Sequence, residues 1–282
     1  MSDQPVTVAM ALKAATCKHR LARLDAEVLL AHALEKGRSW LYSWPEYRLT
    51  PEQWHTAGVF FDRRQQGEPV AYITGRCEFY GLSLTVTHDT LIPRPETEEL
   101  VDVVIELANT TSIRHVLDLG TGSGAIALAL AEHLPQCQIH ASDASGAALA
   151  VAQKNARNLA LKVHFHHGHW FGALDETTPH FDIIVGNPPY IDPADKHLKK
   201  LSYEPRQALV ADNNGLADLF ELIEKAPGHL APGGFLWLEH GSEQGQAVRT
   251  HFTVHGYQAI VTRQDLAGLD RITGGRYASR VC

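Results

Sequence analysis

The most informative segment of the chain is Asp118-Leu119-Gly120-Thr121-Gly122-Ser123-Gly124-Ala125, which lies between the apolar runs His115–Leu119 and Ala125–His133. Glycines in such a loop let the backbone turn tightly and approach a ligand, and the N-terminus of the next helix presents unpaired N–H groups to an anion. Asp143 follows 19 residues after Gly124, where a carboxylate can accept both hydroxyls of a ribose. The segment therefore predicts a nucleoside-binding loop between a strand and a helix. A tight turn without a ligand is the alternative.

Around this loop, short apolar strands alternate with helical segments. Strands are expected at His115–Leu119, Gln138–Ser142, Val163–His167, Asp182–Val185 and Phe235–Glu239. Helices are expected at Thr97–Ala108, Ala125–His133, Ser145–Leu159, Leu216–Leu230 and Gln244–His255. Two further extended segments, Tyr257–Arg263 and Arg276–Val281, flank a glycine-rich loop and are expected to pair antiparallel. The alternation predicts an α/β fold whose mostly parallel sheet is covered by helices on both faces.

The first 75 residues predict a small helical domain. Apolar residues recur at helical spacing in two segments, Val8, Leu12 and Ala15, then Leu21, Leu24, Val28, Leu29 and Ala33. Gly37 is expected to end the second helix, and Thr50-Pro51-Glu52-Gln53 carries the capping signals of a third, which should stop near Gly67. Alternating apolar residues from Phe79 to Val86 predict a strand or hairpin. We therefore expect an N-terminal domain at 1–75, a β-hairpin linker at 76–93 and a larger domain at 94–282.

Aromatic residues gather in the predicted helical domain, at Trp40, Tyr42, Trp44, Tyr47 and Trp54. They form either a binding face or the large rings of a small helical core. Rings at this kind of spacing favour the core.

Composition narrows the class of protein. The chain has 44% apolar and 20% charged residues, which is typical of soluble globular proteins. No apolar run reaches the roughly 18 residues of a membrane span, and residues 1–20 lack the apolar core of a signal peptide. We expect a cytoplasmic protein that does not engage a membrane.

The spacing of the cysteines and of a histidine cluster does not indicate a metal site. Cys17, Cys77, Cys137 and Cys282 contain no Cys-x-x-Cys pair and are expected to be free thiols. On a strand His164 and His166 face one way, whereas His167 and His169 face the other, so four ligands would not converge. No metal site is expected.

Charge bears on the class of partner. The formal net charge is −7, with 10 Lys or Arg and 10 Asp or Glu among residues 1–89 against 15 and 22 in the rest. A broad phosphate-binding surface would normally be basic. Stable nucleic-acid binding is therefore not expected, and a protein or a small molecule is the favoured partner.

The loop alone does not choose the cofactor. Gly120-x-Gly122-x-x-Ala125 satisfies the dinucleotide fingerprint as well, so NAD and S-adenosylmethionine both remain candidates at this point. A dehydrogenase would use the helix N-terminus for pyrophosphate, whereas a methyltransferase would use it for the methionyl carboxylate.

The tetrad Asn187-Pro188-Pro189-Tyr190 points to methyl transfer to nitrogen. It follows the strand Phe181-Asp182-Ile183-Ile184-Val185 and Gly186, so it should lie at the carboxyl end of the sheet beside the cofactor. The prolines remove two N–H donors and leave carbonyl acceptors, to which Asn187 adds its side-chain oxygen. Such a cluster can hold both protons of a planar –NH2 group and orient its nitrogen, while Tyr190 can stack on the flat group. A proline-rich turn without a catalytic role is the alternative.

On these motifs the chain resembles the HemK/PrmC family, which methylates the glutamine side-chain amide in the Gly-Gly-Gln motif of class-one peptide chain release factors. The resemblance extends over essentially the whole chain. It includes Ile92-Pro93-Arg94-Pro95-Glu96-Thr97-Glu98 and Asp265-Leu266-Ala267-Gly268-Leu269-Asp270-Arg271. It implies a Rossmann-like class I methyltransferase with a doubly wound seven-stranded sheet, a connecting β-hairpin, an N-terminal helical domain for substrate recognition, and a role in translation termination.

The resemblance also implies roles for individual residues. S-adenosylmethionine would be held by Gly120, Thr121, Gly122, Ser123, Gly124, Asp143, Trp170 and Asn187, with Trp170 packed against the adenine. The target glutamine would be held by Asn187, Pro188, Pro189 and Tyr190. One position departs from the pattern, because His169 stands where the family often has an Asp beside the adenine amino group. A neutral imidazole can accept that hydrogen bond through one nitrogen.

Three other functions are compatible with parts of the sequence. A DNA or RNA adenine N6-methyltransferase would present the same two protons to the tetrad, but it must flip a base and bind phosphates. An NAD-linked oxidoreductase would leave the tetrad without a role. A catalytically silent binding module is disfavoured by the acceptor tetrad beside an intact cofactor loop.

Overall fold

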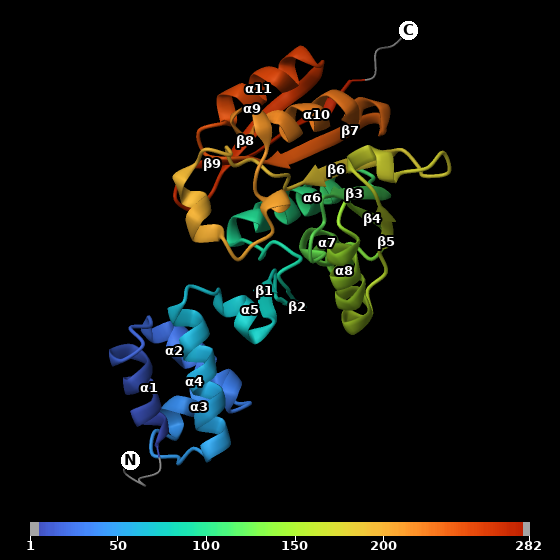
Figure 1. Ribbon diagram of the computed structural model, residues 1–282. Helices are drawn as coiled ribbons and strands as arrows, with labels where there is room; N and C mark the ends of the chain where they lie inside the picture. Colours follow the sequence, from blue (N-terminus) through green and yellow to red (C-terminus); the bar gives the residue numbers. More distant parts are fainter. Residues whose placement is uncertain (1–5, 279–282) are drawn as a thin grey trace. The chain divides into compact units, whose positions relative to one another are not determined.

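The computed structural model describes residues 6–278. The chain divides into two compact units, Met1–Arg76 and Cys77–Cys282. Each described unit has its own buried apolar core. Figure 1 shows the helices of the first unit in blue to cyan and the second unit in cyan-green to red. None of the helices within residues 6–278 is both long and apolar enough to cross a membrane.

The first unit is a helical bundle. Its helices are α1 (Val8–Cys17), α2 (Arg23–Ala33), α3 (Arg38–Ser43), α4 (Pro51–Gln65) and α5 (Val70–Thr74). The predicted capping box of α4 is confirmed, since the Thr50 hydroxyl accepts from the backbone N–H of Gln53 at 3.1 Å and the Gln53 side chain accepts from that of Thr50 at 3.0 Å. Gly37 does not end α2, which stops at Ala33, but is the N-cap of α3. Helices as short as α3 and α5 carry too few apolar positions to show a period.

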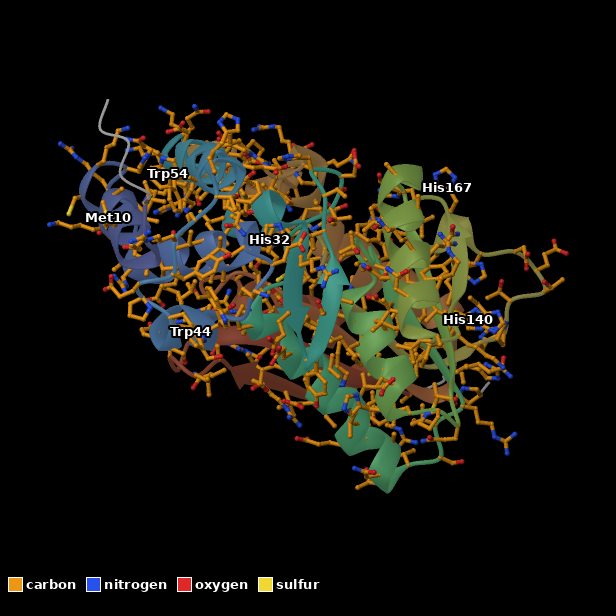
Figure 2. All side chains as sticks on the ribbon, turned by 90° about the horizontal axis from the view of Figure 1, so that it is seen from below. Met10, His32, Trp44, Trp54, His140 and His167 are labelled. Atoms are coloured by element: carbon orange, nitrogen blue, oxygen red, sulfur yellow. The ribbon has the colours of Figure 1, made fainter. Side chains whose placement is uncertain are left out.

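The aromatic residues of this unit divide between core and surface. Trp40 and Trp54 pack against the core, whereas Tyr42 and Trp44 are 60% and 58% exposed. Trp44 and Trp54 lie apart on the unit (Figure 2). The expectation of a core of large rings is therefore right for Trp40 and Trp54 and wrong for Tyr42 and Trp44.

A β-hairpin begins the second unit. Strands β1 (Arg76–Phe79) and β2 (Leu82–Thr85) are joined by Tyr80-Gly81, and both turn residues have positive φ, as a two-residue hairpin turn requires. Phe79 packs into the core of the α/β unit. The buried side chain of Asn155 accepts from the N–H of Thr85 at 2.8 Å and donates to the carbonyls of Thr85 and Ser123, both at 2.9 Å. Asn155 thus ties the hairpin to the glycine loop.

The α/β unit contains the predicted seven-stranded sheet. Its strands are β3 (His115–Leu119), β4 (Gln138–Asp143), β5 (His164–His167), β6 (Phe181–Gly186), β7 (Leu230–Glu239), β8 (Tyr257–Gln264) and β9 (Asp270–Tyr277). The spatial order is β5-β4-β3-β6-β7-β9-β8. Strands β3 to β7 are parallel, and β9 pairs antiparallel with both β7 and β8. The direction of winding reverses between β3 and β6, which is where open α/β sheets bind ligands.

Helices cover the two faces of this sheet (Figure 1). The helices of the unit are α6 (Glu98–Thr110), α7 (Ala125–His133), α8 (Gly146–Leu159), α9 (Asp212–Gly215), α10 (Ala217–Lys225) and α11 (Gly245–Val254). Alternate residues of β3 point to opposite cores, Val116 toward the core lined by α6, α7 and α8, and Leu117 toward the core lined by α10 and α11. The doubly wound arrangement predicted from the sequence is confirmed.

Three boundaries differ from the prediction. The helix expected at Leu216–Leu230 ends at Lys225, because a 3₁₀ turn containing Pro227 follows and β7 already begins at Leu230. The last strand is Asp270–Tyr277 rather than Arg276–Val281, whose end lies outside the described residues. Gly274 belongs to this strand and not to a loop, because it pairs with Trp237 of β7. A Cβ at Gly274 would lie 2.0 Å from the Trp237 ring. The glycines mark a close approach of a side chain to the strand.

Candidate active site

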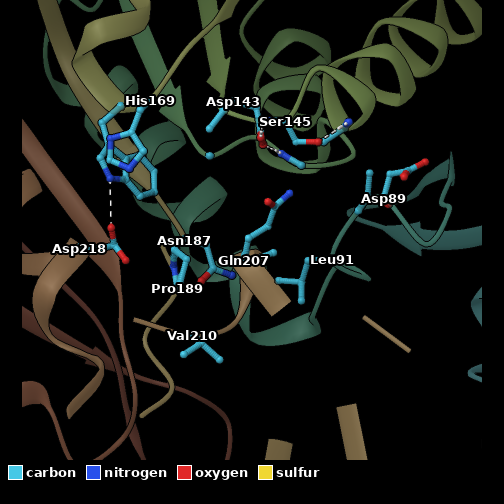
Figure 3. Close-up of a pocket in the computed structure, with 17 residues that line it drawn as sticks. Asp89, Leu91, Asp143, Ser145, His169, Asn187, Pro189, Gln207, Val210 and Asp218 are labelled. Carbon is cyan, nitrogen blue, oxygen red and sulfur yellow. Dashed lines mark hydrogen bonds between the residues drawn. The ribbon is translucent and has the colours of Figure 1, made fainter. Parts of the chain in front are cut away.

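A cavity of about 360 Å³ opens at the carboxyl ends of β3, β4 and β6 (Figure 3). It is lined by Asp89, Thr90, Leu91, Gly120, Gly122, Asp143, Ala144, Ser145, Ala148, His169, Trp170, Asn187, Pro189, Gln207, Ala208, Val210 and Asp218. The predicted site residues Gly120, Gly122, Asp143, Trp170, Asn187 and Pro189 are among them. They come from four different loops, and the topology of the sheet brings them together.

The glycine loop presents bare backbone to this cavity. Gly120 has φ +72° and Gly122 φ +57°, conformations that other residues rarely adopt. A Cβ on Gly120 would lie 3.1 Å from the Trp170 ring, whereas a Cβ on Gly122 would meet nothing within 4 Å. Thr121, Ser123 and Gly124 do not line the cavity. Two glycines therefore shape the cavity wall.

Asp118 braces the loop from beneath. Its carboxylate is fully buried, and one oxygen accepts from the Thr121 hydroxyl at 2.6 Å and from the N–H of Ala127 at 3.2 Å. Burial raises the pKa of Asp118 to about 7. The carboxyl fixes the strand-to-helix turn and does not reach the cavity.

Asp143 lies at the end of β4 with its carboxylate oriented by backbone donors. One oxygen accepts from the N–H of Gly122 and the other from the N–H of Ser145, each at 2.8 Å. Each oxygen keeps a further lone pair. The carboxylate is thereby held at the cavity wall with capacity to accept two hydroxyl protons (Figure 3).

Trp170 forms an adjacent wall. Its ring is buried against Gly120, and its indole N–H donates to Asp218 of α10 at 3.2 Å (Figure 3). Burial raises the pKa of Asp218, and the hydrogen bond from Trp170 opposes this shift. His169 lines the same cavity. Sequence reasoning missed Asp218, because an acidic residue in the first turn of a helix is common and signals no ligand.

The loops at 89–91 and 207–210 were missed as well. Their lining residues Asp89, Thr90, Leu91, Gln207, Ala208 and Val210 carry no motif. Only the tertiary fold brings them to the cavity.

The tetrad Asn187-Pro188-Pro189-Tyr190 separates this cavity from a second one. Asn187 lines both cavities, Pro189 the first, and Pro188 and Tyr190 the second. The second cavity has a volume of about 320 Å³ and is also lined by Leu91, Arg94, Ile191, Leu201, Ala208 and Leu209. The asparagine thus stands at the junction of two adjoining cavities.

The segment Pro93–Glu98 contributes to a cavity wall and also leads into a helix. Arg94 lines the second cavity and pairs with the buried carboxylate of Glu204. Pro95–Thr97 forms a 3₁₀ turn that leads into α6. In the other quoted motif, Asp265 and Arg271 form an ion pair at 3.0 Å.

The histidines of β5 contact His140 rather than a metal site. His140 stacks on His164 and His166, with ring centroids 4.7 and 5.2 Å apart, and lies at the sheet beside β5 (Figure 2). Its Nδ1 is 2.9 Å from Nε2 of His166. In the described part of the chain, no three or more His, Cys, Asp or Glu side chains are grouped to hold a metal ion.

Comparisons with known proteins agree with this geometry. Residues 9–75 match the model of the PrmC N-terminal domain, and residues 101–263 match the methyltransferase small domain. The release factor glutamine methyltransferase of Salmonella typhimurium is 47% identical over 90% of this chain and 92% of that protein. The chain belongs to the release factor glutamine methyltransferase family. Its relatives include the proteins of Coxiella burnetii, 45% identical over 93% of this chain and 94% of theirs, and of Escherichia coli, 45% identical over 90% and 92%.

Solved structures place the fold of this family member among methyltransferases. A methyltransferase from Pyrococcus furiosus, 18% identical, covers 79% of this chain and 98% of its own with a TM-score of 0.52. The hMettl16 catalytic domain, 15% identical, covers 72% and 78% with a TM-score of 0.55. At these identities the likeness concerns the fold alone.

The first cavity of this family member fits S-adenosylmethionine. The space beside Gly122 is open, a carboxylate stands ready for ribose hydroxyls, and Trp170 offers an apolar ring. These groups match the nucleoside half of the molecule. The methyltransferase family of the chain, together with a tetrad that has no role in hydride transfer, supports the methyltransferase rather than the oxidoreductase interpretation of the loop.

Proposed function

We propose that this protein transfers a methyl group from S-adenosylmethionine to the side-chain amide nitrogen of the glutamine in the Gly-Gly-Gln motif of class-one release factors. The observation that carries the proposal is the position of Asn187, which lines both the cofactor cavity and the second cavity. Relatives that are 45–47% identical over most of the chain bear the name of this reaction. The cytoplasmic location expected from the sequence fits a substrate that acts in translation.

The cofactor supplies a methyl group on a sulfonium, which is an electrophile. We assign its ribose to Asp143, whose two oxygens are oriented by backbone N–H groups. We assign its adenine to the wall formed by Trp170 and His169. We propose that Thr121, Ser123 and Gly124 contribute through the shape of the loop, since these residues do not line the cavity.

The glutamine amide belongs in the second cavity, where the tetrad supplies acceptors. The Asn187 side-chain oxygen and the Pro188 carbonyl accept hydrogen bonds from its two N–H groups. Pro189, which lines the first cavity, and Tyr190, which lines the second, confine the planar group. Holding both protons aims the nitrogen at the methyl group, so the main contribution of these residues is positioning. An amide nitrogen becomes strongly acidic once alkylated and loses its proton without a strong base.

Substrate recognition is assigned to the N-terminal unit, residues 1–75, with 76–93 as the linker and 94–282 as the methyltransferase domain. The exposed rings of Tyr42 and Trp44 are candidate contacts with a protein surface, because aromatic side chains are enriched in interfaces. Trp44→Ala should raise KM for the release factor and leave S-adenosylmethionine affinity unchanged. Tyr42 is tested as Tyr42→Phe, which keeps the ring, alongside Tyr42→Ala, because its hydroxyl also donates to the buried Glu27.

The function is tested by methyl transfer from isotope-labelled S-adenosylmethionine. The acceptors are an unmodified release factor, its Gly-Gly-Gln→Gly-Gly-Ala variant, and unmethylated DNA. Label on the first protein alone is expected. Label on DNA alone would reassign the protein to base methylation, and label on both proteins would move the modified residue outside the motif.

A further inference from the structure

Four side chains from three separate segments form a hydrogen-bonded chain behind the tetrad. Asn187 donates through Nδ2 to the Thr97 hydroxyl at 3.1 Å, and that hydroxyl donates to Oε2 of Glu239 at 2.6 Å. The Tyr190 hydroxyl donates to Oε1 of Glu239 at 2.9 Å. Thr97 is 4% and Glu239 1% exposed. The last residue of β7 and the turn before α6 therefore support both ends of the tetrad.

The inventory of protons fixes the direction of this chain. Glu239 in its ionised form, which the hydrogen bonds from Thr97 and Tyr190 and the charge of Arg271 favour, only accepts, so the one hydroxyl proton of Thr97 is committed to it. The Thr97 oxygen then has only lone pairs to offer, and the group facing it from Asn187 must be the –NH2. The Oδ1 of Asn187, at the other end of the amide, has no hydrogen-bond partner within residues 6–278 and is left for the cavities that Asn187 lines.

We propose that Thr97 and Glu239 are positioning residues that hold the Asn187 amide with its oxygen toward the substrate, so that the site selects a primary amide and rejects a carboxylate. The inference rests on the proposed function. The Asn187 oxygen in this place accepts a hydrogen bond from a glutamine –NH2 but repels the carboxylate oxygens of a glutamate. If the Asn187 amide were turned by half a rotation, it would present its –NH2. This group can donate a hydrogen bond to an oxygen of either a glutamine or a glutamate side chain.

Two neighbouring charges act on the Glu239 carboxylate in opposite directions. Arg271 is a favourable charge near the carboxylate, and Glu96 is an unfavourable one. Arg271 also pairs with Asp265 at 3.0 Å, so it is shared between two carboxylates. Burial raises the pKa of Glu239, and the hydrogen bonds from Thr97 and Tyr190 oppose this shift. A proton on Glu239 would be donated to Thr97 or Tyr190 and would reverse part of the chain.

Three substitutions separate orientation from bulk. Glu239→Gln keeps the shape but adds a donor that can point at Thr97 and release the Asn187 amide to turn. Thr97→Val keeps the shape and removes the hydroxyl, whereas Thr97→Ser keeps the hydroxyl. Thr273→Val is the matched control, because Thr273 is a fully buried threonine on β9 that bonds to His240 at 2.7 Å and does not line either cavity.

The experiment measures release factors carrying Gly-Gly-Gln or Gly-Gly-Glu with the full-length enzyme. For each variant, kcat and KM are determined on the glutamine protein, Kd is determined for the glutamate protein, and S-adenosylmethionine affinity is measured as a check on the first cavity. Glu239→Gln and Thr97→Val are expected to lower kcat/KM for glutamine and to tighten glutamate binding, reducing the preference for the amide roughly tenfold or more. Thr97→Ser and Thr273→Val are expected to keep the preference.

Other outcomes overturn the proposal in distinguishable ways. If Glu239→Gln and Thr97→Val lose activity and stability but keep the wild-type preference for glutamine over glutamate, the two residues have a structural role only. If Thr97→Ser fails like Thr97→Val, the hydroxyl is not what matters. If the wild-type enzyme itself transfers no methyl to Gly-Gly-Gln, the proposed function is wrong, and so is the inference that rests on it.

Discussion

Asp143 at the end of β4 accepts the backbone N–H of Gly122 at 2.8 Å, which locks the glycine loop after β3 to the neighbouring strand. The same bond orients the carboxylate that we assign to the ribose. The Asp143 side chain therefore shapes the loop and, in our assignment, also binds the ribose. We therefore expect a substitution of Asp143 to disturb both the loop and the ligand contact.

Asp143→Asn tests this double role. The amide can accept from only one of the two N–H groups that now bond to Asp143, and its –NH2 meets the other as a second donor. We expect S-adenosylmethionine to bind at least about 10-fold more weakly by calorimetry. Asp175→Asn, on an exposed turn away from the cavity, is the control and should bind normally.

Asp218 should matter for cofactor affinity through Trp170. Asp218→Leu removes the acceptor of the indole N–H and is expected to weaken S-adenosylmethionine binding roughly tenfold, because the ring forms a wall of the cavity. Asp218→Asn keeps an acceptor oxygen and should cost much less. Equal losses in both variants would show that the negative charge, and not the orientation of Trp170, is what the cofactor senses.

In the N-terminal unit, Glu27 is a buried carboxylate held by Tyr42, Arg23 and Arg38. The three hydrogen bonds are 2.6, 2.6 and 3.0 Å long. Hydrogen bonds, first from Tyr42 and then from Arg23, lower the pKa of Glu27 to about 2 from 4.5. Glu27→Gln should therefore destabilise the unit by about 1–2 kcal/mol at neutral pH, the arginines being half exposed.

The pH dependence of this contribution has a definite sign. The folded pKa lies below the unfolded one, so the stabilisation is fully present above pH 4.5 and is lost as pH falls toward 2. Urea unfolding of the wild type and of Glu27→Gln at neutral and acidic pH measures it. Curves whose separation does not shrink in acid would contradict the assignment.

The stacked histidines predict a second pH effect in a higher range. Burial and the neighbouring His164 and His166 lower the pKa of His140 to about 4 from 6.5. The unfolded chain then binds the extra proton, and stability falls as pH drops from 6.5 toward 4. The loss at pH 5 should be about 2 kcal/mol. His140→Phe, which keeps a ring in the stack, should flatten the unfolding free energy between pH 7 and 5, whereas an unchanged slope would assign the effect to other groups.

The sequence was most informative where one local pattern determines the local structure. The glycine loop, the capping box at Thr50 and the alternation of strands and helices are of this kind, and all are present. The prediction of strand boundaries failed where a contact with a residue distant in the sequence determines the local structure. Gly274 looked like a loop residue, and only the Trp237 ring packed against it explains why it is a glycine in a strand.

The candidate site was predictable in its motifs and not in its supports. Loop and tetrad each lie within a few consecutive residues, so spacing and residue type suffice to find them. Glu239 bonds to Tyr190 and Thr97, which are 49 and 142 positions away in the sequence, and Asp218 bonds to Trp170, which is 48 positions away. An isolated acidic residue carries no signal until its partners are known.

The most direct test of the account is to locate the methyl group by fragmenting the tryptic peptide that spans the Gly-Gly-Gln motif after incubation of a release factor with enzyme and S-adenosylmethionine. We predict one added methyl on the glutamine side-chain nitrogen. The rate should fall at least about 100-fold in Asn187→Ala, which removes an acceptor that positions the amide. A methyl group on any other atom, or full turnover by Asn187→Ala, would contradict the account.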